Sequence, residues 1–204
     1  MGSIRIFGYK SFKKLSVQLH SINLLIGANG AGKSNFLSLF EMLGNIYEKR
    51  LGAYVAQVGG VDKLLYQGRK VTDRIAVNLL IAKSEYDLAL LESDGKLIVE
   101  REVVGCYGDV CPLDFVRKNV ITEYQSESSL KDHKEEDLSN YISQIRKFHF
   151  HDTGRRSPFT ADSHIVNDAY RMYEHGENLA AILYRIQREK PMAYRRIIRV
   201  IQSV

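Results

Sequence analysis

The first 50 residues change their hydrophobic periodicity twice. Residues 3–7 and 15–19 alternate apolar and polar side chains, which is typical of the two strands of a hairpin, with Gly8 ending the first strand. Residues 22–26 are almost continuously apolar and predict a buried central strand. From Ser34 onward, apolar side chains recur at helical spacing. The pattern therefore predicts a hairpin, a buried strand and an amphipathic helix, in this order.

The middle of the chain has the pattern of an antiparallel meander. Three segments of strand length are rich in apolar residues, at 74–81, 85–91 and 96–104. An Asp-Gly pair separates the last two and is a strong signal for a tight hairpin turn. Residues 52–70 are spotted with glycines and are assigned to neither a strand nor a helix. We expect the meander to pack beside the sheet that contains the buried strand.

The last third of the chain is mostly helical in its pattern. Residues 123–139 are polar and charged, which indicates a surface loop or the exposed start of a helix. The predicted elements that follow are a helix at 138–145, a strand at 146–151, a loop at 152–158, and helices at 178–188 and 193–204.

The composition is that of an ordinary globular protein of 204 residues, with 45% hydrophobic and 26% charged residues. No apolar run approaches the roughly 20 residues of a membrane-spanning helix, and the N-terminus lacks the apolar stretch of a signal peptide. We therefore expect a cytoplasmic protein without a membrane partner. Cys106 and Cys111 are expected to be free thiols, because zinc would require further ligands. The net charge of +5 favours an acidic partner, so DNA is a candidate.

One motif carries recognisable chemistry. Residues 27–34 match the phosphate-loop pattern G-x-x-x-x-G-K-[S/T] in full. Its glycines let the backbone wrap around phosphates, and the helix that follows adds its positive N-terminal dipole. Lys33 is expected between the outer phosphates and the Ser34 hydroxyl on Mg²⁺. The predicted ligands are ATP and Mg²⁺, since no Asn-Lys-x-Asp motif that reads guanine occurs. The loop consists of Gly27, Ala28, Asn29, Gly30, Ala31, Gly32, Lys33 and Ser34.

Around this loop the chain resembles the SMC and RecF type of ABC ATPase, and most of all the bacterial RecF-like AAA/ABC ATPases. The resemblance rests on Lys10-Ser11-Phe12 before the loop, on the loop itself and on Asn35 after it. It extends to the segments at 59–68, 148–153 and 176–184.

The resemblance implies an α/β P-loop NTPase fold of the ABC-head type. Such a head has a mixed sheet around the phosphate loop, an antiparallel β subdomain and a helical lobe. Residues 1–50 would form the strands, the loop and its helix, residues 51–121 the antiparallel meander, and residues 122–204 a strand-loop and the start of the helical lobe. We expect residues 1–204 to be the N-terminal portion of one head.

The resemblance also implies roles for residues outside the loop. Lys10, Ser11 and Phe12 would lie near the adenosine, and Asn35 would belong to the same site. The segment 151–153 would take the place of the loop that senses Mg²⁺ and the γ-phosphate, which makes Asp152 a candidate Mg²⁺ ligand. The glutamine expected in that loop is not present there. Two protomers of such heads sandwich two ATP molecules, so a homodimer is expected for the full-length protein.

Two segments that this family needs for hydrolysis are not found. No apolar strand ends in Asp-Glu, and no Leu-Ser-x-Gly signature occurs. The nearest candidate, residues 88–92, forms one arm of the predicted Asp-Gly hairpin. No catalytic residue is identified, so the chain alone should bind nucleotide weakly and hydrolyse little ATP.

Two further groups of residues have open interpretations. His149 and His151 precede Asp152, with Asp162 and His164 nearby, and could form a metal site, a nucleotide-sensing loop or structural histidines. A basic stretch near the C-terminus is either a DNA-contacting or a solvated surface. It contains Arg185, Arg188, Lys190, Arg195, Arg196 and Arg199, and the pair Arg155-Arg156 has the same two interpretations.

Two functions compete. The first is an ATP-driven switch in DNA maintenance or anti-phage defence. The second is a nucleotide-dependent scaffold or regulator of an effector nuclease or toxin that does not itself bind DNA. A membrane-transporter ATPase is less favoured because the Lys-Ser-Phe segment is not expected there.

Overall fold

The computed structural model describes the chain in two compact units, Met1–Ile145 and Arg146–Val204, which we call the N-terminal unit and the C-terminal unit. The described residues are 2–106, 117–133, 136–148, 157–158 and 168–203.

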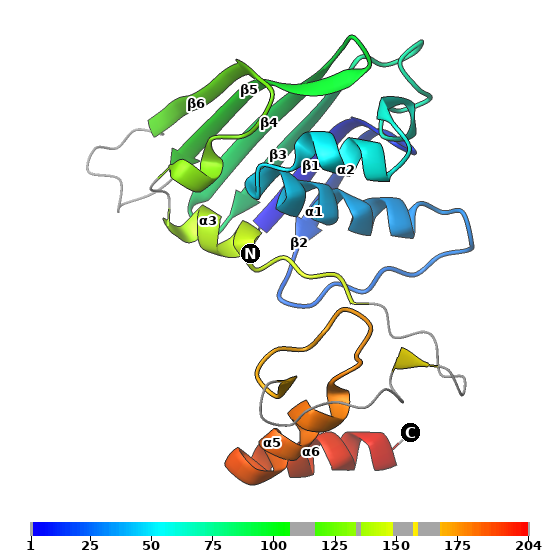
Figure 1. Ribbon diagram of the computed structural model, residues 1–204, viewed down its shortest axis with the longest axis vertical. Coiled ribbons are helices and arrows are strands. Elements are labelled where there is room, and N and C mark those ends of the chain that lie inside the picture. Colours follow the sequence, from blue (N-terminus) through cyan, green and yellow to red (C-terminus); the bar gives the residue numbers. More distant parts are fainter. Residues whose placement is uncertain (1, 107–116, 134–135, 149–156, 159–167, 204) are drawn as a thin grey trace. The chain divides into compact units, whose positions relative to one another are not determined.

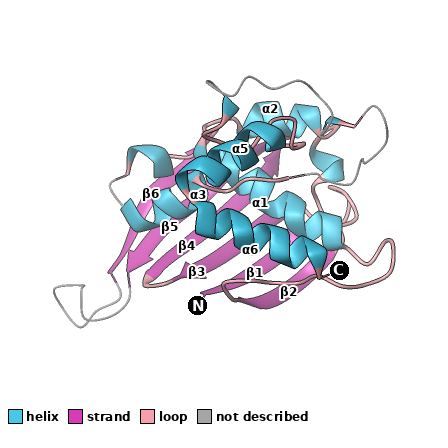
Figure 2. Ribbon diagram, turned by 90° about the horizontal axis from the view of Figure 1, so that it is seen from below, coloured by secondary structure: helices cyan, strands magenta, loops and turns pink. Residues whose placement is uncertain are grey.

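The N-terminal unit is built on one six-stranded sheet with the strand order β2-β1-β3-β4-β5-β6. Helices α1, α2 and α3 lie over one face of this sheet (Figure 1 and Figure 2). The strands are β1 Gly2–Tyr9, β2 Phe12–Leu19, β3 Arg74–Ile81, β4 Ser84–Ser93, β5 Lys96–Cys106 and β6 Arg117–Gln125. The helices are α1 Lys33–Tyr47, α2 Leu51–Gln57 and α3 Glu136–Ser143, with 3-10 turns at Val61–Lys63 and Leu130–Asp132.

The expectation of a mixed sheet with a separate meander is wrong for the described residues. All neighbouring strands are antiparallel, and the N-terminal hairpin joins the meander because β1 pairs with β3. Ile4 and Ile6 of β1 and Val77 and Leu79 of β3 are buried on the same face. The two predicted parts therefore share one core, which explains why they form a single sheet.

The prediction of a buried strand at residues 22–26 is also wrong. The segment has no regular secondary structure, and Ile22, Leu24 and Ile26 are 89%, 80% and 85% exposed. A central strand is buried only when other strands pair with both of its edges. Within the described part of the chain, β1–β6 pair with one another and not with this segment. Instead, the Asn23 side chain exchanges hydrogen bonds with the His20 backbone and closes a local turn.

Helix α1 confirms the amphipathic helix predicted after the glycine-rich loop. Leu39, Met42, Leu43 and Ile46 are buried at helical spacing and belong to the core. Leu37 lies on the other side of the helix and is exposed. The buried side of α1 therefore fixes its position over the sheet.

The meander is confirmed. β3 coincides with the predicted segment 74–81, and β4 and β5 extend the other two by one or two residues at their ends. The turn between β4 and β5 has positive φ at both Asp94 (+51°) and Gly95 (+77°), as a two-residue hairpin turn with φ > 0 at both positions requires.

Gly8 does not end the first strand, because β1 continues through it to Tyr9. Its φ is +71°, and a Cβ atom at this position would lie 2.1 Å from the backbone oxygen of Arg74. A glycine is therefore needed where β1 passes so close to β3.

Two elements were not predicted. α2 lies almost entirely in the glycine-spotted segment at 52–70, for which the sequence predicts neither a strand nor a helix. β6 includes residues 123–125 of the predicted surface loop. α2 is only seven residues long, and Gly59 and Gly60 follow it closely. β6 pairs with β5 on one side only, and its polar side chains match an edge strand.

The C-terminal unit contains the helices α5 Leu179–Glu189 and α6 Pro191–Gln202, which confirm both predicted helices. Asn178 precedes α5 and is fully buried. Its side-chain amide donates to the backbone oxygens of Asp168 and Arg171 and accepts from the backbone N–H of Tyr173. Residues 146–148 of the predicted strand have no regular structure, and the rest of that strand lies outside the described residues.

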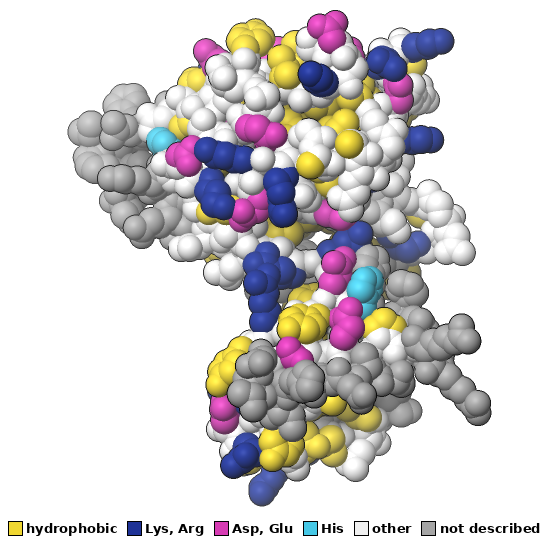
Figure 3. Space-filling view, in the orientation of Figure 1, with side chains coloured by type: hydrophobic (Ala, Val, Ile, Leu, Met, Phe, Trp, Pro, Cys, Tyr) yellow, Lys and Arg dark blue, Asp and Glu magenta, His cyan; other side chains and the backbone are white. Residues whose placement is uncertain are grey.

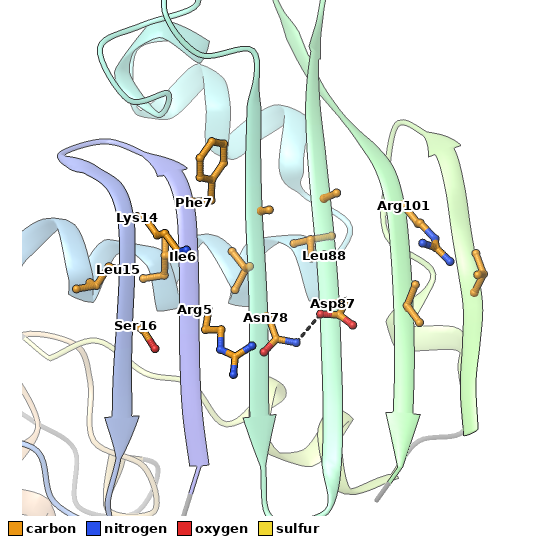
Figure 4. Close-up of a pocket in the computed structure, with 15 residues that line it drawn as sticks. Arg5, Ile6, Phe7, Lys14, Leu15, Ser16, Asn78, Asp87, Leu88 and Arg101 are labelled. Carbon is orange, nitrogen blue, oxygen red and sulfur yellow. Dashed lines mark hydrogen bonds between the residues drawn. The ribbon is translucent and has the colours of Figure 1, made fainter. Parts of the chain in front are cut away.

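The face of the sheet opposite α1 carries a shallow trough of about 820 Å³. Figure 4 shows Arg5 of β1, Asn78 of β3 and Asp87 of β4 side by side in it. The Asn78 side chain donates to the Asp87 carboxylate. This face is polar at its centre, as is common for an antiparallel sheet that packs on one side only.

Candidate nucleotide-binding site

The phosphate loop turns directly into α1. Gly30 and Gly32 have φ values of +84° and +91°, which favour glycine, and Gly32 is the residue that precedes the helix. The Ala31 N–H donates to the Ala28 oxygen (3.2 Å), and the Phe36 N–H donates to the Gly32 oxygen (2.9 Å). The loop therefore forms a tight turn whose end is the first turn of the helix.

Lys33 folds back over the loop. Its Nζ donates to the backbone oxygens of Gly27 (2.6 Å) and Ala28 (2.7 Å). Both partners are neutral carbonyl groups, and an ammonium group binds a phosphate oxygen more strongly than a neutral carbonyl. The ammonium group is thus held at the mouth of the loop, in a position from which it can exchange its carbonyl partners for phosphate oxygens.

The N-terminus of α1 is open to an anion. No side chain caps it, and no acidic residue lies in its first turn. The first backbone N–H groups of a helix have no partner within the helix and carry a partial positive charge. Ser34 is exposed in this first turn, so its hydroxyl is accessible to a Mg²⁺ ion bound to a phosphate. The loop, the lysine and the helix end therefore fit the triphosphate of a nucleotide.

The turn between β1 and β2 packs against this loop. Asn35 Nδ2 donates to Ser11 Oγ (2.9 Å). A Cβ atom on Gly32 would lie 3.1 Å from Ser11 Oγ and 3.2 Å from the Phe12 ring. The structure thus brings Ser11, Phe12, Gly32 and Asn35 together.

Lys10, in the same turn, is held by a network of hydroxyl groups that the sequence did not reveal. Its Nζ donates to Ser38 Oγ (2.8 Å), and the Tyr9 hydroxyl lies 2.9 Å from the same oxygen. The Tyr54 hydroxyl donates to the Ser38 backbone oxygen (3.2 Å). Burial raises the pKa of Tyr9 and of Tyr54 above the ordinary value, so both hydroxyls keep their protons. The only sequence signal for Ser38 is its position one helical turn after Ser34.

A groove of about 910 Å³ borders the β1–β2 turn. Lys10, Ser11 and Asn35 form one side, and the segment from 62 to 70 forms the other. Basic side chains outnumber acidic ones here, and Asp62 is paired with Arg69 (3.1 Å). The groove therefore offers a positively charged surface next to the loop.

The loop and the start of α1 contain no acidic side chain. Residues 20–40 include no Asp or Glu, so the loop and the first two turns of α1 supply no general base. Residues 20–31 are all exposed, so the loop is open to solvent. The described loop and helix start therefore suit binding of a phosphate chain.

Several predicted residues lie outside the described part of the chain. They are Cys111, His149, His151, Asp152, Arg155, Arg156, Asp162 and His164, and the side chain of Cys106 is also not described. Among the described residues, no group of three or more His, Cys, Asp or Glu side chains could hold a metal ion. Ser34 is therefore the one predicted Mg²⁺ ligand whose position the structure gives.

The basic residues near the C-terminus fall into two sets. Arg185 pairs with Glu189 (2.9 Å), donates to the Ala169 oxygen and lies 4.5 Å from the centre of the Tyr170 ring, which is a packing role. The other five are exposed: Arg188 and Lys190, and Arg195, Arg196 and Arg199 of α6.

On the N-terminal unit, basic and acidic side chains alternate over the face shown in Figure 3. This face therefore differs from the exposed arginines of α6. Lys131 pairs with Glu48, and Lys49 with Asp132. In each of these exposed pairs a basic side chain is matched by an acidic one, so the pairs add no net charge to this surface.

One comparison with known proteins identifies a family for this chain. A search of curated proteins gave no match to the chain. Separately, no helix among the described residues is long and apolar enough to span a membrane. A family model described as the AAA ATPase domain matches residues 1–180, which include the phosphate loop and the β1–β2 turn. This confirms the broader part of the resemblance, an AAA/ABC-type ATPase. The chain therefore belongs to the family of AAA ATPase domains.

Proposed function

We propose that this chain binds Mg·ATP as the phosphate-loop part of a RecF/SMC-like ATPase that acts as a nucleotide-driven switch. The observation that carries the proposal is the pairing of Lys33 with an uncapped helix N-terminus at the end of the loop. Both groups present positive charge at one place, and only neutral carbonyl groups now hold the lysine.

In this proposal, each residue has a defined task. The backbone N–H groups at 32–34 face the phosphates, and the Lys33 ammonium moves from the carbonyls of Gly27 and Ala28 to phosphate oxygens. Mg²⁺ supplies further charge neutralisation on the phosphates when it is bound. The exposed Ser34 hydroxyl would be its protein ligand.

We further propose that residues 1–204 are the N-terminal portion of an ABC-type head. The support is the exposed apolar segment at 22–26, which lies just before the loop and has the composition of a buried strand. Strands that pair with it would also fix the loop. Hydrolysis then requires a signature segment and an acidic strand end from elsewhere, and two heads would sandwich ATP as a homodimer.

The first test compares Mg·ATP binding by the 204-residue chain with that of Lys33→Ala. We expect Lys33→Ala to weaken binding about tenfold or more, because it removes a charge-assisted contact to phosphate. Lys49→Ala is the matched control, since Lys49 lies beyond the far end of α1 and should leave binding unchanged. Equal binding by wild type and Lys33→Ala would refute the proposed site.

For the cellular role, we propose a cytoplasmic switch in DNA maintenance or anti-phage defence. The exposed arginines of α6 favour contact with nucleic acid. The second candidate is a nucleotide-dependent scaffold or regulator of an effector nuclease or toxin, which fits the balanced charge of the N-terminal unit. Salt-dependent binding of DNA separates the two, because it is expected for the first candidate only.

A further inference from the structure

The β1–β2 turn is held in a backbone conformation that its sequence does not favour. Lys10 has a φ of +46°, a left-handed value that costs a residue other than glycine about 1–2 kcal/mol. Lys10 and Ser11 are the two residues between β1 and β2, and a hairpin turn of the II′ type has φ > 0 at the first of its two residues. The contacts of Lys10 therefore offset the cost of placing a side chain at a turn position that favours glycine.

Three contacts hold Lys10 in this conformation. Its backbone N–H donates to the Leu64 oxygen (2.7 Å). The preceding residue, Tyr9, forms an isolated β-bridge with Leu65. The side-chain ammonium donates to Ser38 Oγ (2.8 Å) on α1. The backbone is thus held by the segment at 64–65 and the side chain by α1.

Ser38 is the centre of the side-chain network. It is nearly buried, its hydroxyl donates to the Asn35 oxygen (2.9 Å), and it lies within hydrogen-bond distance of both Lys10 and the Tyr9 hydroxyl. Asn35 in turn donates to Ser11. One chain of hydrogen bonds therefore connects the β1–β2 turn to the helix that begins at the phosphate loop.

We propose that Ser38, with the Tyr9 hydroxyl, is a positioning residue that holds the Lys10 ammonium as a second cation for the bound nucleotide. The inference rests on the proposed Mg·ATP binding at the loop and goes beyond it, because it assigns a role to residues that neither the motif nor the resemblance includes. Lys10 lines the groove next to Asn35, and one hydrogen bond connects its ammonium to the same helix as Lys33 and Ser34.

The test measures the acylation rate of individual lysines by mass spectrometry, with and without Mg·ATP. In the nucleotide-free protein, Lys10 should react several-fold more slowly than the exposed Lys13, because its ammonium is engaged. Mg·ATP should slow the reaction of Lys10 and Lys33 and leave Lys13 unchanged. Ser38→Ala should raise the Lys10 rate in the absence of nucleotide, and Ser38→Thr, which keeps the hydroxyl, should not.

ATP affinity gives the second readout. Lys10→Asn removes the ammonium but keeps a residue that tolerates the left-handed conformation, and we expect about tenfold weaker binding. Ser38→Ala should weaken ATP binding about three- to tenfold, although it leaves the sequence of the phosphate loop unchanged. Lys49→Asn is the matched control, because Lys49 is also a lysine with a left-handed φ (+55°), and its partner is Asp132.

The outcomes separate this inference from the proposed function. If Mg·ATP protects Lys33 but not Lys10, and Lys10→Asn binds as wild type does, the loop binds ATP and the second cation is refuted. If neither lysine is protected, both proposals fail. If Ser38→Ala leaves the reactivity of Lys10 unchanged while the protein stays folded, Ser38 does not position it.

Discussion

At the scale of single residues, two glycines of the phosphate loop differ in their surroundings. Gly30 and Gly32 both have φ values in the left-handed region, +84° and +91°. A Cβ atom on Gly30 would meet no atom within 4 Å, whereas one on Gly32 would press against Ser11 and Phe12. The first position therefore needs a glycine for its conformation only, and the second needs it for conformation and space.

This difference gives a prediction for stability. Gly30→Ala should lower the free energy of unfolding by about 1 kcal/mol through backbone strain. Gly32→Ala should lower it by about 2–3 kcal/mol, because the added methyl group also displaces the β1–β2 turn. Urea unfolding of both variants measures the difference. Equal losses would show that the turn does not pack against the loop as described.

At the scale of elements, one buried carboxylate joins β5 to its neighbours. Glu102 is fully buried. Its Oε1 accepts hydrogen bonds from Tyr86 of β4 and from the Ser128 hydroxyl (2.6 Å). Its Oε2 accepts from the Thr122 hydroxyl of β6 (2.8 Å) and from the Ser129 N–H (2.9 Å). Four donors thus surround one side chain, which ties the segment after β6 to the sheet.

Glu102→Gln should destabilise the N-terminal unit by about 2–4 kcal/mol. The amide can accept at one oxygen only, so two of the four buried donors lose their partner. Glu123→Gln on β6 is the matched control, because Glu123 is exposed and its pair with Arg101 should contribute less than about 1 kcal/mol. Thermal unfolding checks both. Similar midpoints for the two variants would contradict a buried carboxylate at position 102.

The elements that could be predicted from the sequence are those with local signals. The segments at 74–81, 85–91 and 96–104 have strand periodicity, and the helix after the loop has its own spacing. The segment at 22–26 has the composition of a central strand, yet its burial depends on partner strands. Likewise, β6 is polar, and its strand conformation comes from pairing with β5.

The candidate site also contains residues that the sequence predicts and residues that only the structure identifies. The phosphate loop is a contiguous motif, so its residues could be identified from spacing alone. Tyr9, Lys10 and Tyr54 meet at Ser38 only in the folded structure, and no sequence pattern predicts these contacts. These hydroxyl groups lie on three separate elements, so no periodic pattern in the sequence indicates that they are close in space.

At the scale of the whole molecule, charge is distributed unevenly along the chain. Residues 1–145 contain 18 Lys and Arg and 18 Asp and Glu, so the net charge of +5 comes from residues 146–204. Within this part, residues 185–199 contain six basic side chains and one acidic side chain, Glu189. Of these six, Arg195, Arg196 and Arg199 are exposed on α6, within about one helical turn of one another. We therefore expect an acidic partner to bind the C-terminal unit in preference to the N-terminal unit.

This distribution gives the last prediction, which decides between the two cellular roles. If α6 contacts duplex DNA, replacing Arg195, Arg196 and Arg199 with Gln should weaken binding and reduce the slope of log K against log salt by about 2–3, since each phosphate contact contributes about 0.9. The control variant replaces Lys13, Lys83 and Lys96, which are exposed in the N-terminal unit, and loses the same net charge. An equal loss in both variants would indicate non-specific attraction to a basic protein. Absence of salt-dependent binding in the wild type would instead favour the scaffold or regulator, because that role requires no positively charged contact with a phosphate backbone.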